Sequence, residues 1–189
     1  MKLTVLENCQ DCQNVLNLIT FLDVKHELKV FKTTKALTQQ PFQEKSLYST
    51  LPLIETEDGL FLNNYYSIMK YVASQARVTS LVGESDSARA LETEFLLLIQ
   101  QIDSAIAKWE SLKDEDRANN KDLVEGLSKN LGYLERKLQY DMFLLGTKMS
   151  YVDILAVLSF KRAAGIVSGK GNLKNLKRVM NFLESSGLL

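Results

Sequence analysis

The spacing of hydrophobic positions changes several times in the first third of the chain. Residues 2–7 alternate between polar and apolar side chains, as a short strand does, and residues 26–31 alternate again. Between them lies a helical spacing of apolar residues, formed by Val15, Leu16, Ile19 and Leu22. Asn8 is suited to cap the start of that helix. The pattern therefore predicts a strand, a helix and a second strand.

A hairpin signal follows a polar, helix-like segment that ends near residue 50. Two short apolar runs, at 51–56 and 60–62, flank the turn sequence Glu57-Asp58-Gly59. Asn63 or Asn64 is placed to cap a further helix, whose inward positions are Ile68, Met69, Tyr71 and Val72. This order of elements is that of a thioredoxin-like α/β domain, which we place at residues 1–78.

From residue 84 onward the apolar spacing is helical throughout. Two long stripes advance by three or four residues, at Leu91, Phe95, Leu98, Ile102, Ile106 and Trp109, and at Leu123, Leu127, Leu131, Leu134 and Leu138. The polar run 113–120 between them predicts a loop, and further helices are expected after Ser150 and over 173–183. We therefore expect an all-α domain at residues 84–189, joined to the first domain by a linker at 76–83.

Composition narrows the classes of function. Lys plus Arg and Asp plus Glu number 23 each, so the formal net charge is zero and no global field draws the chain to nucleic acid or an anionic membrane. Two cysteines in 189 residues do not make a disulfide framework, which favours a reducing compartment. We expect a cytoplasmic protein.

Cys9 and Cys12 lie directly after the first predicted strand, at the start of the first predicted helix. A helix N-terminus stabilises a thiolate, so this position suits a reactive thiol. The alternative is that one cysteine packs in the core and the other has no role, and Asp11 between them opposes a thiolate. A zinc site is not expected, because His26 stands alone and no second pair of ligands follows.

Two further local signals concern backbone structure. Ser150 and Asp153 precede an apolar run and predict a capping box, in which Asp153 reaches back to the chain before the helix. Leu51-Pro52 stands where a strand begins. A cis bond there would turn the backbone toward a ligand, whereas a trans bond would simply open the strand.

Basic residues near the C-terminus have two interpretations. Lys161 and Arg162 interrupt an apolar helix and are typical of a solvated helix face. A modest basic cluster that could touch tRNA phosphate consists of Lys170, Lys174, Lys177 and Arg178. No aromatic or glycine-rich recognition motif accompanies this cluster, so a solvated face is the simpler interpretation.

Two stretches together resemble the cytosolic glutathione transferases. Residues 51–71, with the hairpin and the helix that begins near Ser67, resemble the end of their first domain. Phe143-Leu144-Leu145-Gly146 followed by Ser150 to Ile154 resembles the capping box and hydrophobic staple of their second domain. The resemblance covers nearly the whole chain and implies the glutathione-transferase fold, with a thioredoxin-like N-terminal domain and a helical C-terminal domain.

The resemblance also concerns the glutathione site. Members that bind glutathione carry an acidic residue or Gln followed by Ser before the third helix, where this chain has Asn64 and Tyr65. A tyrosine in place of the serine lacks the small hydroxyl donor, and its ring fills the space that serine leaves open. Non-catalytic members of this fold in translation share such a changed motif, among them the N-terminal domain of methionyl-tRNA synthetase, the accessory protein of the multi-synthetase complex and the gamma subunit of elongation factor one.

In the synthetase-associated group, these domains pair through the helix after the capping box, where an arginine stands nine residues beyond the aspartate. Arg162 has this position relative to Asp153, so the resemblance implies an interface at Arg162 and Lys161. The first hypothesis is therefore a non-catalytic adaptor, without a cofactor, that binds another transferase-like domain of the translation machinery.

The alternative hypothesis is an enzyme of glutathione chemistry. A glutathione transferase or a glutaredoxin-like thiol oxidoreductase would use Cys9 as nucleophile and Cys12 as the resolving thiol. Glutathione would then lie at Leu51, Pro52 and Tyr65.

Overall fold

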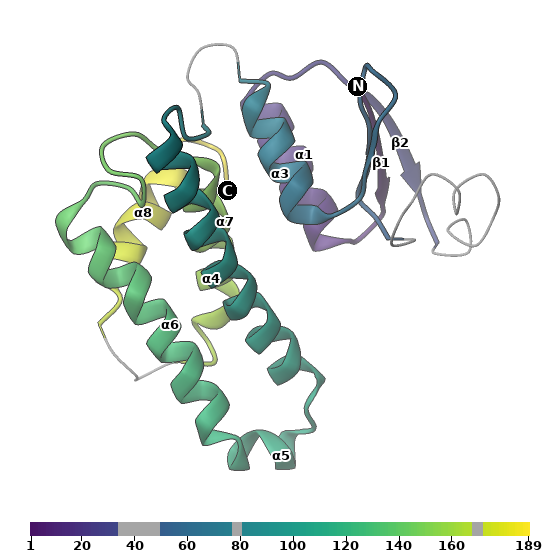
Figure 1. Ribbon diagram of the computed structural model, residues 1–189. Coiled ribbons are helices and arrows are strands. Elements are labelled where there is room, and N and C mark those ends of the chain that lie inside the picture. The colour runs from purple at the N-terminus through teal and green to yellow at the C-terminus, as the bar shows by residue number, and fades with distance from the viewer. Residues whose placement is uncertain (34–49, 77–80, 168–171) are drawn as a thin grey trace. The chain divides into compact units, whose positions relative to one another are not determined.

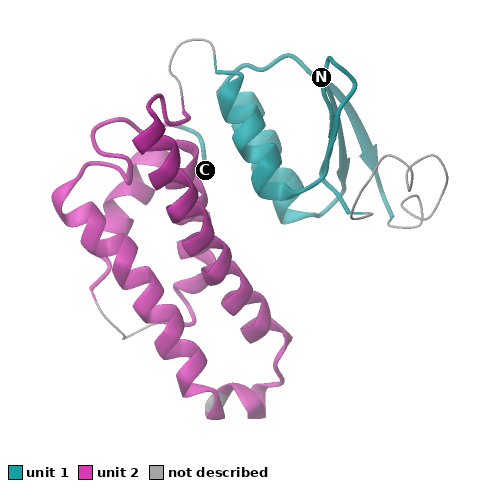
Figure 2. Cartoon of the chain, viewed as in Figure 1, with its two compact units in different colours: residues 1–80, 187–189 teal, residues 81–186 magenta. Residues whose placement is uncertain are grey.

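The chain divides into two compact units, which Figure 2 colours separately: residues 1–80 with 187–189, and residues 81–186. The structure, a computed structural model, describes residues 1–33, 50–76, 81–167 and 172–189. The helix-like segment predicted before residue 50 lies outside the described residues. The boundary at residue 80 falls inside the linker predicted at 76–83.

The first unit contains a four-stranded mixed sheet in the order β2-β1-β3-β4. Its strands are β1 (Lys2–Leu6), β2 (Glu27–Phe31), β3 (Leu53–Glu55) and β4 (Phe61–Leu62). β1 pairs in parallel with β2 and antiparallel with β3, and β3 and β4 form the expected hairpin. Gly59 has a φ of +84° in the turn between them, a conformation that glycine adopts without steric cost.

Two helices lie side by side along this sheet, α1 (Gln10–Phe21) and α3 (Tyr65–Ser74) (Figure 1). The core between sheet and helices is apolar and fully buried, and it includes Leu3, Val15, Leu18, Ile19, Ile54, Ile68, Met69 and Val72. Residues of both predicted helical stripes contribute to it, because an amphipathic helix buries its apolar face against the sheet. For the described residues of this unit, the predicted α/β order is therefore confirmed.

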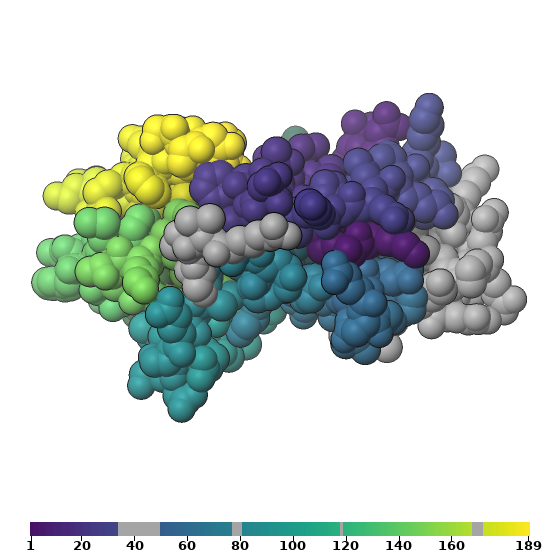
Figure 3. All heavy atoms as spheres, turned by 90° about the horizontal axis from the view of Figure 1, so that it is seen from above, coloured from purple at the N-terminus to yellow at the C-terminus, as the bar shows by residue number. Residues whose placement is uncertain are grey.

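The second unit is built from helices alone within the described residues. They are α4 (Asp86–Ser111), α5 (Asp114–Asn119), α6 (Lys121–Tyr140), α7 (Tyr151–Ala163) and α8 (Lys174–Ser185). α7 is buried over most of its surface and packs against α4 and α8 (Figure 1). α8 also packs on α6, and the yellow and green atoms of these two helices adjoin in Figure 3. Ile102, Ile106, Leu131 and Leu134 from the two predicted stripes are fully buried, and so is Ile99, which the first stripe did not include.

Two sequence-based expectations about local structure are wrong. The run 113–120 is not a plain loop, because residues 114–119 form the short helix α5. Its first turn holds Asp114, Glu115 and Asp116, and acidic side chains stabilise a helix N-terminus. The cap of α1 is Cys9 and not Asn8; Asn8 adopts a left-handed conformation with φ of 62°, which asparagine tolerates.

Residues 81–83 are fixed to the helical unit. The carbonyl of Leu81 accepts a hydrogen bond from the amide of Tyr151, and the amide of Gly83 donates to the buried carboxylate of Glu92 at 3.1 Å. A Cβ atom on Gly83 would lie 2.8 Å from backbone atoms of Ala88 and Arg89, so only glycine fits against the start of α4. No helix in the described part of the chain is both long and apolar enough to cross a membrane.

Candidate functional site

The candidate site begins where β1 passes into α1. Cys9 is the N-cap residue of α1, with φ of −97° and ψ of 119°, and its side chain is half-buried. The backbone amide of Cys12 donates to the Cys9 sulfur at 3.4 Å, and the amide of Gln13 donates to the Cys9 carbonyl at 3.0 Å. The Cys9 sulfur therefore takes the position of a capping group, at the helix end where negative charge is stabilised.

Cys12 has different surroundings, since its side chain is only 1% exposed. The backbone amide of Leu6 donates to the Cys12 sulfur at 3.4 Å. Burial raises the pKa of the Cys12 thiol to about 12, and its hydrogen bond to Cys9 and the charges of Cys9 and Asp11 act in the same direction. The Leu6 amide opposes these effects on the pKa without cancelling them. Cys12 consequently keeps its proton at neutral pH.

A chain of polar side chains leads from α1 to the start of α3. The amide nitrogen of Gln10 donates to Asn14 Oδ1 at 3.1 Å, and Asn14 Nδ2 donates to the hydroxyl of Tyr65 at 3.2 Å. The ring of Tyr65 meets the ring of Tyr66 edge to face, with 5.3 Å between their centroids. Tyr65, whose position the resemblance assigns to a small serine, is therefore held by two contacts, one at its hydroxyl and one at its ring.

The other predicted residues of this unit lie at the ends of its elements. Asn64, the second of the two expected capping residues, caps α3 by accepting a hydrogen bond from the amide of Ser67 at 3.1 Å. The Leu51–Pro52 bond is cis and immediately precedes β3, with Pro52 buried and Leu51 half-buried. His26 is exposed, and Nδ1 of its ring lies 3.0 Å from the Val24 carbonyl.

The sequence pattern does not mark Gln10 or Asn14 as functional residues. Asn14 is only 9% exposed, between the apolar positions of α1, and buried polar side chains are rare enough to mark a specific partner. The signal was present in the sequence as a polar residue beside Val15 in the apolar stripe. Its partner Tyr65, 51 residues further along the chain, becomes apparent only in three dimensions.

Both predicted interface residues form ion pairs with other residues of the helical unit. Arg162 donates to a carboxylate oxygen of Glu110 at 2.9 Å and lies 3.7 Å from Asp103. Lys161 pairs with Glu184 at 3.0 Å. Both cations are partly exposed, and their binding to another protein stays a prediction.

Arg178 binds main-chain atoms at the end of α6. Its guanidinium donates to the carbonyls of Leu138, Asp141 and Met142 at 3.0–3.2 Å and so caps the C-terminus of that helix. Lys174 and Lys177 are exposed on α8, and Lys170 lies outside the described residues. The predicted contact of this basic cluster with tRNA stays a prediction.

The capping box at the start of α7 is present and buried. The carboxylate of Asp153 accepts from the amides of Leu144 and Ser150 at 2.7 and 2.9 Å, and from the Ser150 hydroxyl at 2.7 Å. Burial raises the pKa of Asp153, while these hydrogen bonds act to lower it. No three His, Cys, Asp or Glu side chains of the described ranges gather as a metal site would require.

Comparison with known proteins identifies the family. Residues 89–186, slightly more than half of the chain, match the family described as Glutathione S-transferase, C-terminal domain. The chain therefore belongs to the glutathione S-transferase-like superfamily. A search of curated proteins finds no match to the sequence.

Solved structures agree with this assignment at the level of the fold. A glutathione S-transferase domain-containing protein of Marinobacter aquaeolei VT8 has a TM-score of 0.80 and 18% identity, with both chains covered over 100%. A class Gtt2 glutathione S-transferase of Vibrio parahaemolyticus has a TM-score of 0.78 and 19% identity, covering 100% of this chain and 98% of that one.

A family member of Pseudomonas fluorescens Pf-5, solved with two glutathione molecules bound, has a TM-score of 0.77 and 17% identity over 99% of this chain and 89% of its own. Identities this low establish a shared fold only. The predicted glutathione-transferase fold is thus confirmed, whereas the narrower resemblance to translation-associated members stays a prediction.

Proposed function

We propose that the protein binds glutathione and transfers thiols by disulfide exchange at Cys9. The observation that carries this proposal is the position of the Cys9 sulfur at the N-cap of α1, where it accepts the amide hydrogen of Cys12. An N–H donor and the positive end of a helix both favour a thiolate, which is the nucleophilic form of cysteine. This arrangement supports the enzyme hypothesis over the adaptor hypothesis.

The reaction begins on a mixed disulfide between glutathione and another thiol. The Cys9 thiolate attacks the glutathione sulfur, a bond forms between these two sulfurs, and the other thiol leaves as a thiolate and takes a proton from water. The thiolate of a second glutathione molecule, whose proton has gone to water, then attacks the glutathione sulfur on Cys9. The bond between that sulfur and Cys9 breaks, glutathione disulfide leaves, and the electron pair stays on the Cys9 thiolate.

Two further observations support binding of the tripeptide. The fold is shared with proteins named glutathione S-transferases, one of which is solved with two glutathione molecules. Leu51 and Pro52, directly before β3, occupy the place that the resemblance assigns to the glutathione site. Tyr65 replaces the serine of that site, and we propose that its hydroxyl, already held by Asn14, forms part of the pocket wall.

The test is the glutathione-dependent reduction of a glutathionylated peptide. We expect the wild-type protein to accelerate it and Cys9→Ser to fall to the rate of glutathione alone, because a hydroxyl is a poor nucleophile at neutral pH. Thr20→Ala, an exposed substitution on α1 away from the N-cap, should keep the wild-type rate. Equal rates for the wild type and Cys9→Ser would refute the proposal.

The second candidate function is the non-catalytic adaptor. The observation that favours it is Tyr65, a bulky ring fixed by Asn14 where the resemblance expects a small hydroxyl. In this case the protein would not be retained on immobilised glutathione, and native cytosol would yield a synthetase or elongation-factor component as partner. Arg162→Ala should then weaken partner binding, and unchanged affinity would remove Arg162 as the anchor.

A further inference from the structure

The strand β2 lies at one edge of the sheet, where β1 is its only partner among the described residues (Figure 1). The amide of Glu27 donates to the carbonyl of Met1 at 3.0 Å, so this residue directs its backbone groups toward β1. Successive residues of a strand direct their backbone groups to opposite sides, and those of Leu28 and Val30 therefore point away from β1. Such an edge is a template for pairing with another strand.

The same two residues present apolar side chains beside the core. Leu28 lies opposite Leu3 and Val30 lies opposite Val5 in the parallel register, and paired residues share a face of the sheet. Leu3 and Val5 are buried in the core, whereas Leu28 and Val30 are 49% and 52% exposed. Covering this edge would therefore remove apolar surface from water, which favours association.

The other face of β2 carries charges of both signs. Glu27 and Lys29 are exposed, and Lys29 Nζ lies 4.9 Å from the centroid of the Phe31 ring. An antiparallel copy of the same strand presents these charges in reverse order. When two copies are centred on Leu28, Glu27 of each copy lies directly opposite Lys29 of the other, and opposite charges in directly paired positions stabilise a sheet.

Other symmetric registers do not give this match. Centring the two strands on Lys29 places two lysines opposite each other, and like charges in paired positions are destabilising. Centring them on Val30 places Glu27 opposite Thr33, which carries no charge. The backbone edge, the apolar face and the charged face thus fit one partner, which is a second copy of this chain.

We propose that two copies of the chain associate through β2, with the two β2 strands antiparallel and the Leu28 residues opposite each other. The sheet then continues across a two-fold axis, the commonest symmetry of protein dimers, from β4 of one copy to β4 of the other. No residue of the candidate site lies on β2, so this association is independent of thiol transfer.

The test measures association of the full chain by sedimentation equilibrium at low salt, with a reductant present to prevent disulfides between copies. We expect the wild type to form dimers as its concentration rises. Lys29→Glu and Glu27→Lys each place like charges opposite each other, and each should raise the dissociation constant of the dimer about tenfold or more. Lys129→Glu makes the same change of net charge at an exposed position of α6 and should leave the dissociation constant unchanged.

Mixing the two single variants gives a sharper measurement. A Lys29→Glu chain has glutamate at both positions and a Glu27→Lys chain has lysine at both, so every charged pair between the two chains is attractive. The mixture should form heterodimers about as readily as the wild type forms its dimer. A variant that had merely lost its fold would not recover association on mixing.

The amide of Leu28 reports the backbone pairing directly. Its hydrogen exchange, followed by NMR, should slow as the concentration of the wild type rises and stay fast in Lys29→Glu. A dimer that leaves this exchange unchanged, or that the single variants do not weaken, forms through another surface and would overturn the proposal. So would a mixture of the two variants that stays monomeric. A wild type that stays monomeric at every concentration would overturn it too, and would leave this edge to an extended segment of another protein.

Discussion

The side-chain amide of Asn14 donates a hydrogen bond to the phenolic oxygen of Tyr65 at 3.2 Å, and this bond ties α1 to the first turn of α3. Asn14 is buried, so its amide cannot exchange this acceptor for water without a structural change. The contact joins the helix that carries both cysteines to the residue that distinguishes this chain from the glutathione-binding pattern. A change at the start of α3 is therefore expected to affect the stability of α1, whose N-terminus holds Cys9.

Tyr65→Phe should therefore destabilise the thioredoxin-like unit by about 1 kcal/mol, because the Asn14 amide loses an acceptor. Hydrogen exchange of the α1 and α3 amides measures this loss within the unit. The matched substitution Tyr140→Phe removes a hydroxyl from a side chain that is 83% exposed, and it should change stability by less than about 0.5 kcal/mol. Equal effects of the two substitutions would show that the Asn14 contact contributes nothing.

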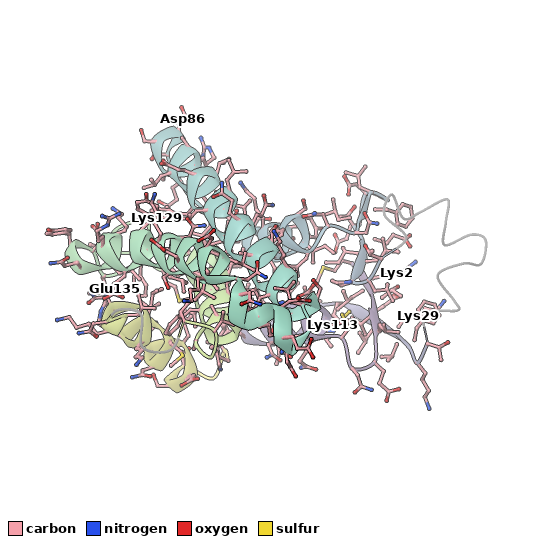
Figure 4. The ribbon with its side chains drawn as sticks, turned by 90° about the horizontal axis from the view of Figure 1, so that it is seen from below. Lys2, Lys29, Asp86, Lys113, Lys129 and Glu135 are labelled. Atoms are coloured by element: carbon pink, nitrogen blue, oxygen red, sulfur yellow. The ribbon has the colours of Figure 1, made fainter. Side chains whose placement is uncertain are left out.

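Glu135 supplies the N-terminal cap of α8 from a different helix. Its carboxylate on α6 accepts from the amides of Asn175 and Leu176 at 2.9 Å, and Figure 4 shows its side chain directed toward α8. Leu173, the N-cap residue of α8, has no side-chain cap of its own. Glu135→Ala should destabilise the helical unit by about 2 kcal/mol, because charged acceptors at a helix start are strong.

The fluorescence of Trp109, the single tryptophan of the chain, reports unfolding of the helical unit in urea. Glu125→Ala is the control, since Glu125 is an exposed glutamate on the same helix. A loss for Glu135→Ala no larger than that for Glu125→Ala would contradict the capping role.

Asp153 and Ser85 cap the N-terminal turns of α7 and α4, two helices of the same unit, in different surroundings. The Asp153 carboxylate is 1% exposed and accepts the amides of Leu144 and Ser150, whereas Ser85 caps α4 at an exposed position. Asp153→Ala should cost about 3 kcal/mol because it leaves buried amides unpaired. Ser85→Ala should cost about 1 kcal/mol. Urea unfolding followed by Trp109 fluorescence compares the two, and a smaller loss for Asp153→Ala would be inconsistent with its burial.

Stability above neutral pH should depend on Cys12. Its pKa is about 12 in the folded chain and lower when unfolding exposes the thiol, so the unfolded state loses this proton first as the pH rises. The stabilising contribution of the neutral thiol is complete below the unfolded pKa and declines from there toward pH 12. The wild type should therefore lose more stability than Cys12→Ala between about pH 8 and pH 10.

The measurement is the free energy of unfolding of both proteins in urea at the two pH values. Both proteins contain the same lysine and tyrosine residues, so the titration of these residues cancels when the losses of unfolding free energy are subtracted. A loss of equal size in both would show that burial of Cys12 does not favour its neutral form.

The sequence predicted the order of elements because the hydrophobic period reports directly which face of each element is buried. It did not identify Cys9 as the cap of α1, since cysteine is not a usual capping residue and Asn8 beside it is. It missed α5 because the six residues of this helix, five of them polar, carry no apolar stripe. That segment is stabilised by its acidic first turn and by the hydrogen bonds that Arg117 donates to the carbonyls of Trp109 and Glu110.

The candidate site was predictable only in part for a related reason. Cys9 and Cys12 are near each other in sequence, so their spacing alone placed both at the helix start. The Asn14–Tyr65 contact and the pairing of Arg162 with Glu110 join residues 51 and 52 positions apart. Such contacts depend on the tertiary packing of helices, which a local hydrophobic pattern does not specify.

Gly83 determines where the chain can be divided. Its amide donates a hydrogen bond to Glu92, and its Cα leaves no space for a side chain against α4. Two residues earlier, the carbonyl of Leu81 accepts a hydrogen bond from the amide of Tyr151. Residues 81–83 thus connect the start of α4 to the start of α7. A proteolytic cut or an inserted sequence before Leu81 leaves both contacts in the helical unit. A cut or insertion after Gly83 would separate residues 81–83 from the two helices that they contact.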